Sequence, residues 1–235
     1  MTSEQQTRIE LAAAYRLVNQ FGWDDLIFTH LSAKIPNTET FLINQYGLRF
    51  DEITASNLVK VDLEGNVIGE GIINPAGFVI HSAIHEARPD VQFIIHTHTN
   101  EGVAVSADKR GLLPISQRAV IIARNLSYHD YTGIVVDDDE RITLQHDLGN
   151  NEYFILRNHG LLTVGRNVAS AFMNMYRLQK SCEIQVLTNL DNAIIVDNTV
   201  INNATSKVVK FSQNSSPNQL AWDALVRSLP ESYKQ

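Results

Sequence analysis

Residues 91–98 read Val-Gln-Phe-Ile-Ile-His-Thr-His, a mostly apolar run that ends in two histidines separated by one residue. Such a run predicts a β-strand that is buried on both faces. Alternate residues of a strand point to the same face, so His96 and His98 are expected side by side, roughly 6–7 Å apart along the backbone. Two imidazoles at that spacing can bind one cation, because Zn–N bonds are only about 2.0–2.1 Å long. The stretch therefore predicts a buried strand that carries a metal site.

A third histidine, His159, follows a second apolar run, Tyr153–Leu156, in the turn sequence Asn158-His159-Gly160. Two histidines from one strand and one from the end of another give three protein ligands and an open position, as in catalytic metal sites. The alternative is that each histidine is an ordinary buried side chain with a hydrogen-bond partner. Three histidines in these positions favour metal binding.

Apolar patterns along the rest of the chain predict strands interleaved with helices. Further strands are expected at residues 26–35, 40–43, 58–62, 67–68, 126–128, 134–136, 153–156 and 161–164. Helices are expected around residues 11–18, 78–88, 142–148, 168–190 and 217–229. Helices that can cover both faces of a sheet predict a three-layer α/β sandwich. No repeat or low-complexity linker divides the chain, so we expect one domain over residues 1–235, with a polar lead at 1–7 and an ambiguous segment at 192–211.

Composition limits the classes of partner. The formal net charge of −7 argues against a general nucleic-acid or anionic-membrane surface, since such partners bind basic faces. No apolar stretch approaches the ~20 residues that span a bilayer, and the first ten residues lack a secretory signal's apolar core. One cysteine, Cys182, permits no internal disulfide, which fits a reducing cytosol. These features predict a soluble cytoplasmic protein that binds neither nucleic acid nor a membrane.

Several motifs resemble the class II (metal-dependent) aldolase and adducin head-domain family. They follow one another in family order over roughly residues 8–190, which is more specific than any single motif. The matching stretches are Phe28-Thr29-His30-Leu31-Ser32-Ala33-Lys34, Asn74-Pro75-Ala76-Gly77 with His81, Ile95-His96-Thr97-His98, and Arg157-Asn158-His159-Gly160-Leu161-Leu162.

The resemblance implies a three-layer α/β/α sandwich with a largely antiparallel central sheet, assembled as a cyclic homotetramer with active sites at subunit interfaces. It also implies a divalent metal, commonly Zn²⁺, on His96, His98 and His159. Family members that are lyases bind a ketose through its carbonyl and adjacent hydroxyl. The metal then acts as a Lewis acid that stabilises the enediolate formed when the C–C bond breaks.

The chain departs from the sugar-phosphate enzymes of this family at two places. Gly77 stands four positions before His81, where the aldolases and epimerases have an acidic residue that serves as acid and base. Their phosphate-binding loops are replaced by Thr29-His30, Tyr46-Gly47 and Pro75-Ala76, which offer few hydroxyl or amide donors. We therefore expect an unphosphorylated substrate, with His30, Gly47 and Gly77 at the substrate-binding positions.

Other residues are candidates for proton transfer or substrate contact. Tyr131 matches a family tyrosine that donates a proton from the rim of the site, and the alternative is an aromatic packed in an interface. His129 and Asp130 could replace the lost carboxylate, and Arg118 or His30 could bind an anionic group. Tyr233 could reach a neighbouring subunit's site.

Two further features have a plain structural interpretation. His81 and His85 stand at i and i+4 on an expected helix, a spacing that can hold a metal, but we expect them to be structural or to support the site from behind. The acidic run Asp137–Glu140 is expected to be a solvated loop.

Two hypotheses follow. The first is a metal-dependent lyase, or a related dehydratase, epimerase or decarboxylase, that acts on a small hydroxy-carbonyl compound. The second is an adducin-like assembly domain with a structural or vestigial metal site. Stretches closer to adducin heads than to aldolases support the second: Leu112–Ser116, Tyr128–Tyr131 and Cys182–Gln185.

Overall fold

The computed structural model describes residues 2–133, 138–204 and 216–235. Its strands are β1 (His30–Lys34), β2 (Thr40–Ile43), β3 (Val59–Asp62), β4 (Phe93–Thr97), β5 (Leu126–His129), β6 (Tyr153–Leu156) and β7 (Gly160–Gly165). Its main helices are α1 (Ser3–Gln20), α2 (Pro75–Ala87), α3 (Asn100–Ser106), α4 (Gln117–Ile122), α5 (Asp138–Leu148), α6 (Val168–Leu187) and α8 (Pro217–Val226). Residues 198–204 are also helical.

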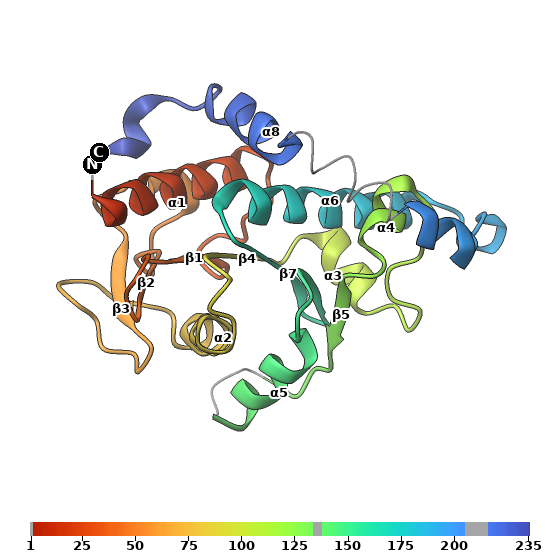
Figure 1. Ribbon diagram of the computed structural model, residues 1–235, viewed down its shortest axis with the longest axis horizontal. Coiled ribbons are helices and arrows are strands. Elements are labelled where there is room, and N and C mark those ends of the chain that lie inside the picture. Colours follow the sequence, from red (N-terminus) through yellow and green to blue (C-terminus); the bar gives the residue numbers. More distant parts are fainter. Residues whose placement is uncertain (1, 134–137, 205–215) are drawn as a thin grey trace.

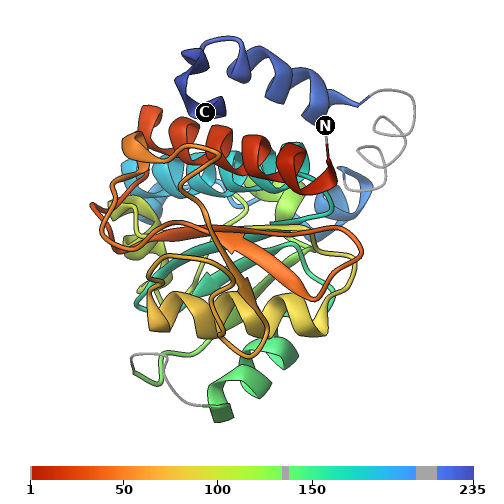
Figure 2. The same ribbon diagram turned by 90° about the vertical axis from the view of Figure 1, so that its left-hand side faces the viewer.

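The seven strands form one sheet in the order β3-β2-β1-β4-β7-β6-β5. Neighbouring strands are antiparallel except β5 and β6, which are parallel. Helices α1, α6 and α8 lie on one side of the sheet and α2 and α5 on the other (Figures 1 and 2). This arrangement confirms the predicted α/β architecture and the largely antiparallel sheet.

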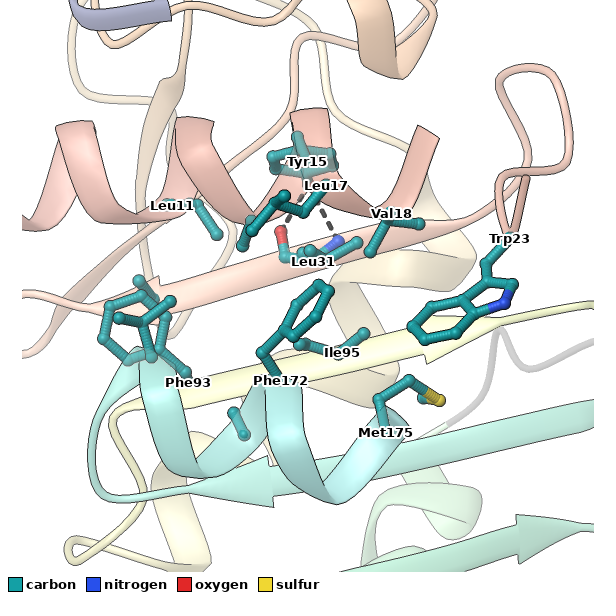
Figure 3. Close-up of a cluster of buried hydrophobic side chains, with 14 of the residues drawn as sticks. Leu11, Tyr15, Leu17, Val18, Trp23, Leu31, Phe93, Ile95, Phe172 and Met175 are labelled. Atoms are coloured by element: carbon teal, nitrogen blue, oxygen red, sulfur yellow. Dashed lines mark hydrogen bonds between the residues drawn. The ribbon is translucent and has the colours of Figure 1, made fainter. Parts of the chain in front are cut away.

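The helices on the first side pack on the sheet through apolar side chains (Figure 3). Phe172 and Met175 of α6 lie over Ile95 of β4, and all three are buried. The hydroxyl of Tyr15, on α1, accepts a hydrogen bond from the Leu31 backbone N–H at 2.8 Å. A buried tyrosine needs such a partner, so this bond fixes α1 over β1.

The second side has its own apolar layer. Here buried side chains of α2 and α5 pack against the face of β4, β6 and β7 that points away from α1 and α6. The helices contribute Ile80, Ile84, Leu144 and Leu148, and the strands contribute Ile94, Phe154 and Leu162. Because β4 and β7 are covered from both sides, they form the buried centre of the sheet. The sequence predicted this from the apolar run that opens β4.

Element boundaries differ from the expected ones where local chemistry intervenes. Helix α2 begins at Pro75, three residues before the expected start at residue 78. The Asn74 side chain caps it by accepting a hydrogen bond from the Ala76 backbone N–H, and proline suits the first helical turn. Strand β1 begins only at His30, because residues 26–27 form a turn in which Leu26 has a φ of 51°. The expected strand at 67–68 is reduced to one bridge, Val61 to Val67.

Polar segments of the chain depart from the expected structure at two places. Helix α1 begins at Ser3, so residues 3–7 of the expected polar lead are helical. The prediction of a solvated loop at 137–140 is wrong for residues 138–140, which belong to α5. The strand expected at 134–136, residue 137 and the part of the ambiguous segment from 205 onward lie outside the described residues. Within the described ranges, no helix is long and apolar enough to cross a membrane.

Candidate metal centre

Three histidines meet at one end of the two central strands. His96 is in β4, His98 follows the last residue of β4, and His159 precedes the first residue of β7. One nitrogen from each ring lies within 4.8 Å of the others, and the Nε2 atoms of His96 and His98 are 2.8 Å apart. The expected pairing of alternate strand residues therefore holds, and β6 and β7 bring the third ring to the pair.

The outer nitrogens of two of these rings already have partners. His96 Nδ1 donates to the Leu161 carbonyl at 2.9 Å, and His98 Nδ1 donates to the Asp25 carboxylate at 3.1 Å. Each Nε2 is then left with its lone pair, and the lone pairs face one another. This donor set fits a divalent cation, since ligating histidines usually donate the other ring N–H to a carbonyl or carboxylate.

The lowered pKa values of the three rings also suit metal binding. Burial, together with the nearby His98 and His129, lowers the pKa of His159 to about 4. Burial also lowers the pKa of His96 well below its usual value and lowers that of His98, which Asp25 partly offsets. Neutral imidazole is the form that ligates metals, so the cluster is ready to bind one at neutral pH.

The turn that carries His159 depends on two backbone positions. Asn158 adopts a φ of 56°, a left-handed conformation that asparagine tolerates better than most residues. A Cβ on Gly160 would press against the Thr97 carbonyl oxygen and lie 3.1 Å from His98 Cδ2. Glycine here lets β7 approach β4 closely enough for the rings to meet.

Of the predicted substrate-binding residues, the structure brings two together. His30 lies opposite His96 in the β1–β4 register, and their ring centroids are 5.0 Å apart. Gly77, in the first turn of α2, faces the His30 ring, and a Cβ there would lie 2.6 Å from His30 Cδ2. Gly47 lies in the exposed loop after β2, beyond the strand end that is nearest His30.

Tyr131 borders a small cavity beside His159, and its side chain is 55% exposed. The same cavity is lined by His129, Asp130 and Glu140. His129 Nδ1 lies 2.8 Å from Asp147 Oδ2, and its Nε2 lies 3.5 Å from Glu140 Oε1. Carboxylates therefore lie beside His159: Asp130, which the sequence offered as a candidate, and Glu140, which the sequence missed because it placed this residue in a solvated loop.

Other candidates lie elsewhere. Arg118 is exposed, with its guanidinium 5.8 Å from the Tyr176 ring centroid. The prediction that Tyr233 reaches a neighbouring subunit is wrong for this structure, because its side chain is buried in the chain's own core beside α1. Asp25 was missed, since nothing in the sequence signals that the loop before β1 approaches His98.

The chain is similar to known proteins of two kinds. Residues 9–186 match the family model described as Class II Aldolase and Adducin N-terminal domain. The solved structure of an aldolase II superfamily protein from Pseudomonas syringae is 44% identical, with 100% of this chain and 97% of that chain covered and a TM-score of 0.94. The solved L-fuculose 1-phosphate aldolase from Glaciozyma antarctica is 30% identical, with 99% and 93% covered and a TM-score of 0.84. Alpha-adducin from Rattus norvegicus is 46% identical over 205 residues, which are 83% of this chain but 28% of the adducin.

Proposed function

The chain belongs to the class II aldolase and adducin family, and we propose that it is a metal-dependent lyase for a small, unphosphorylated hydroxy-carbonyl compound. The observation that carries the proposal is the convergence of three histidine nitrogens within 4.8 Å, with the outer nitrogens of two rings already hydrogen-bonded. In this proposal His96, His98 and His159 hold a divalent cation, and the all-nitrogen donor set favours Zn²⁺.

A cation held there supplies a Lewis acid that polarises the substrate carbonyl. The chain's own groups orient the site, since Leu161 and Asp25 fix the rings of His96 and His98. Tyr131, beside the cavity next to His159, is the proposed proton donor. A phenol O–H in this position can give a proton to a developing carbanion.

The residues at the positions that match the phosphate-binding loops of the sugar-phosphate enzymes favour an unphosphorylated substrate. Ala76 has a side chain without a hydrogen-bond donor. Gly47 offers only its backbone N–H. A phosphate dianion would need several donors or cations to replace its hydration, and these positions supply few.

A screen of hydroxy-aldehydes, hydroxy-ketones and β-hydroxy acids with the metal-loaded protein tests this function. We expect turnover that requires metal and that is abolished by His159→Ala. His146→Ala is the matched control, because His146 lies on α5 with its side chain 86% exposed and is not one of the three clustered histidines. Turnover that survives chelation and His159→Ala would contradict the proposal.

A second candidate is an adducin-like interaction domain, favoured by the similarity to alpha-adducin and by Gly77 in place of the acid–base carboxylate. Tight partner binding without any turnover in the same screen would support it. The same site could also serve a dehydratase, epimerase or decarboxylase, and the products of the screen distinguish these reactions. We further propose a homotetramer, which light scattering tests as four times the 26.3 kDa chain mass.

A further inference from the structure

We propose that a buried histidine–serine chain, formed by His30, His81, Ser32 and His85, holds the His30 imidazole where the family's acid–base carboxylate would stand and presents its Nε2 to the substrate. This inference rests on the proposed function for the identity of the ligand. The placement of His30 against Gly77 is a separate feature and has its own test.

The four side chains form one continuous set of hydrogen bonds. His30 Nδ1 lies 2.8 Å from His81 Nε2, His81 Nδ1 contacts Ser32 Oγ, and Ser32 Oγ lies 2.8 Å from His85 Nε2. All four side chains are buried. His30 Nε2, at the end of the set, makes no hydrogen bond to another residue in the described part of the chain.

The sequence spacing explains how the chain forms. His30 and Ser32 are alternate residues of β1 and so share one face of the strand. His81 and His85 are four apart on α2 and share one face of the helix. Because α2 packs across β1, the two pairs interlock. The i, i+4 histidines, whose spacing could have held a metal, are thus engaged in hydrogen bonds with β1.

A serine hydroxyl has one proton, so Ser32 can donate to only one of its two histidine neighbours. With all three histidines neutral, the hydrogen bonds of the set can therefore run in either of two directions. In one direction His85 donates to Ser32, Ser32 to His81 and His81 to His30, so that His30 Nε2 carries an N–H. In the reverse direction every bond is turned round, and His30 Nε2 offers a lone pair. The ring proton of His85 then lies on its Nδ1, a buried atom without a hydrogen-bond partner among the described residues. His30 can therefore contact either a carbonyl oxygen or a hydroxyl without any change in net charge. A hydroxy-carbonyl substrate presents both of these groups.

Gly77 is what makes room for this arrangement. A Cβ at residue 77 would lie 2.6 Å from His30 Cδ2 and 2.9 Å from His30 Nε2, closer than van der Waals contact allows. The volume that a carboxylate-bearing side chain would enter is thus filled by a ring from β1. Gly77 in place of an acidic residue and the His30 ring in the space beside it therefore depend on each other. We call this pairing the His30–Gly77 exchange.

The exchange is tested first by unfolding measurements on Gly77→Ala, His30→Ala and the double variant. Gly77→Ala alone should lower the denaturation midpoint, and removal of the ring should restore part of that loss in the double variant. Gly102→Ala is the matched control, since a Cβ there lies 2.7 Å from Leu161 Cγ and does not meet His30. Its effect should simply add to that of His30→Ala. No recovery in the Gly77→Ala/His30→Ala double variant would overturn the exchange.

The positioning role is tested by the binding of acetohydroxamate, an oxygen chelator with adjacent carbonyl and hydroxyl groups, to the metal-loaded protein. Ser32→Ala should raise its dissociation constant at least tenfold while metal content stays at the wild-type value. Ser181→Ala removes a hydroxyl that is equally buried and that, among the described residues, bonds only to the Arg177 carbonyl. This variant should bind the probe as wild type does. A purely structural role would lower stability in both variants and leave probe binding unchanged.

The outcomes separate this inference from the proposed function. If the wild-type protein took up no metal, the proposed function and the substrate contact of His30 would both be contradicted. The His30–Gly77 exchange would still be decided by the unfolding measurements. A wild-type protein that binds metal and probe, together with a Ser32→Ala variant of the same affinity, would overturn the positioning role alone.

Discussion

His98 Nδ1 lies 3.1 Å from the carboxylate of Asp25, which belongs to the loop before β1. The hydrogen bond fixes the tautomer of His98 and turns its Nε2 toward His96. It also adds a negative charge behind a proposed metal ligand, which strengthens the ligand's donation. A loop far away in the sequence therefore shares in the geometry of the cluster.

Replacing Asp25 with Asn should weaken metal binding about 10–100-fold, the usual effect of removing a carboxylate behind a ligating histidine. The measurement is competition with a chromophoric chelator. Asp24→Asn is the matched control, because Asp24 accepts a hydrogen bond from Asn19 rather than from a histidine of the cluster. Equal metal affinity in the two variants would show that Asp25 does not support the site.

Tyr131→Phe should lower turnover about 10²–10⁴-fold if the phenol transfers a proton. Because its side chain is 55% exposed, the substitution should change the free energy of unfolding by only about 0.5 kcal/mol or less. Steady-state kinetics on the substrate found in the screen gives the first value and denaturant titration the second. Tyr176→Phe, a substitution within the aromatic cluster around Trp23, should leave turnover unchanged.

The pH dependence of stability should carry the signature of the buried His85. Burial lowers the pKa of His85 to about 3, and the charge of Lys34 acts in the same direction. An unfolded histidine has a pKa near 6.5, so below that pH the unfolded chain binds a proton that the folded chain does not. The stability from this group is complete above about pH 6.5 and is lost as the pH falls toward the folded value.

Within that window His85 alone contributes a slope of up to about 1.4 kcal/mol per pH unit. Denaturant titrations between pH 7 and 4.5 should therefore give a shallower dependence for His85→Gln than for wild type. His146→Gln, at an exposed position, serves as the control and should follow the wild-type slope. Parallel curves for His85→Gln and wild type would contradict a neutral, buried His85.

Tyr15→Phe should destabilise the protein by about 1–3 kcal/mol, because it leaves the buried Leu31 N–H without its hydrogen-bond partner (Figure 3). The ring itself stays, so its edge-on packing against Phe50 is retained. A denaturant titration gives the value. A change below about 0.5 kcal/mol would mean that this bond does not fix α1 over β1.

The sequence predicted the features that depend on the periodicity of side chains along a single helix or strand. Apolar runs gave β2 and β6 with their observed bounds, and the spacing of His96 and His98 gave their common face. Patterns of this kind survive folding because a strand's alternation and a helix's repeat are set by the backbone itself. The family resemblance then supplied the largely antiparallel arrangement of the sheet.

The sequence could not predict contacts that form only when separate elements pack. Asp25 reaches His98 through a turn at residues 26–27, and Glu140 faces His129 because α5 starts earlier than its apolar pattern indicates. The histidine–serine chain likewise needs α2 laid across β1. Gly77 signalled only a missing carboxylate until the structure placed the His30 ring against it.

The metal content of the purified wild-type protein and of His96→Ala, measured by elemental analysis, tests the central claim most directly. We predict one divalent ion per wild-type chain and its loss from His96→Ala, with His146→Ala retaining the ion. A wild-type chain that remains metal-free after incubation with Zn²⁺, or a His96→Ala variant that keeps a full equivalent, would contradict the assignment of a metal centre to these three histidines.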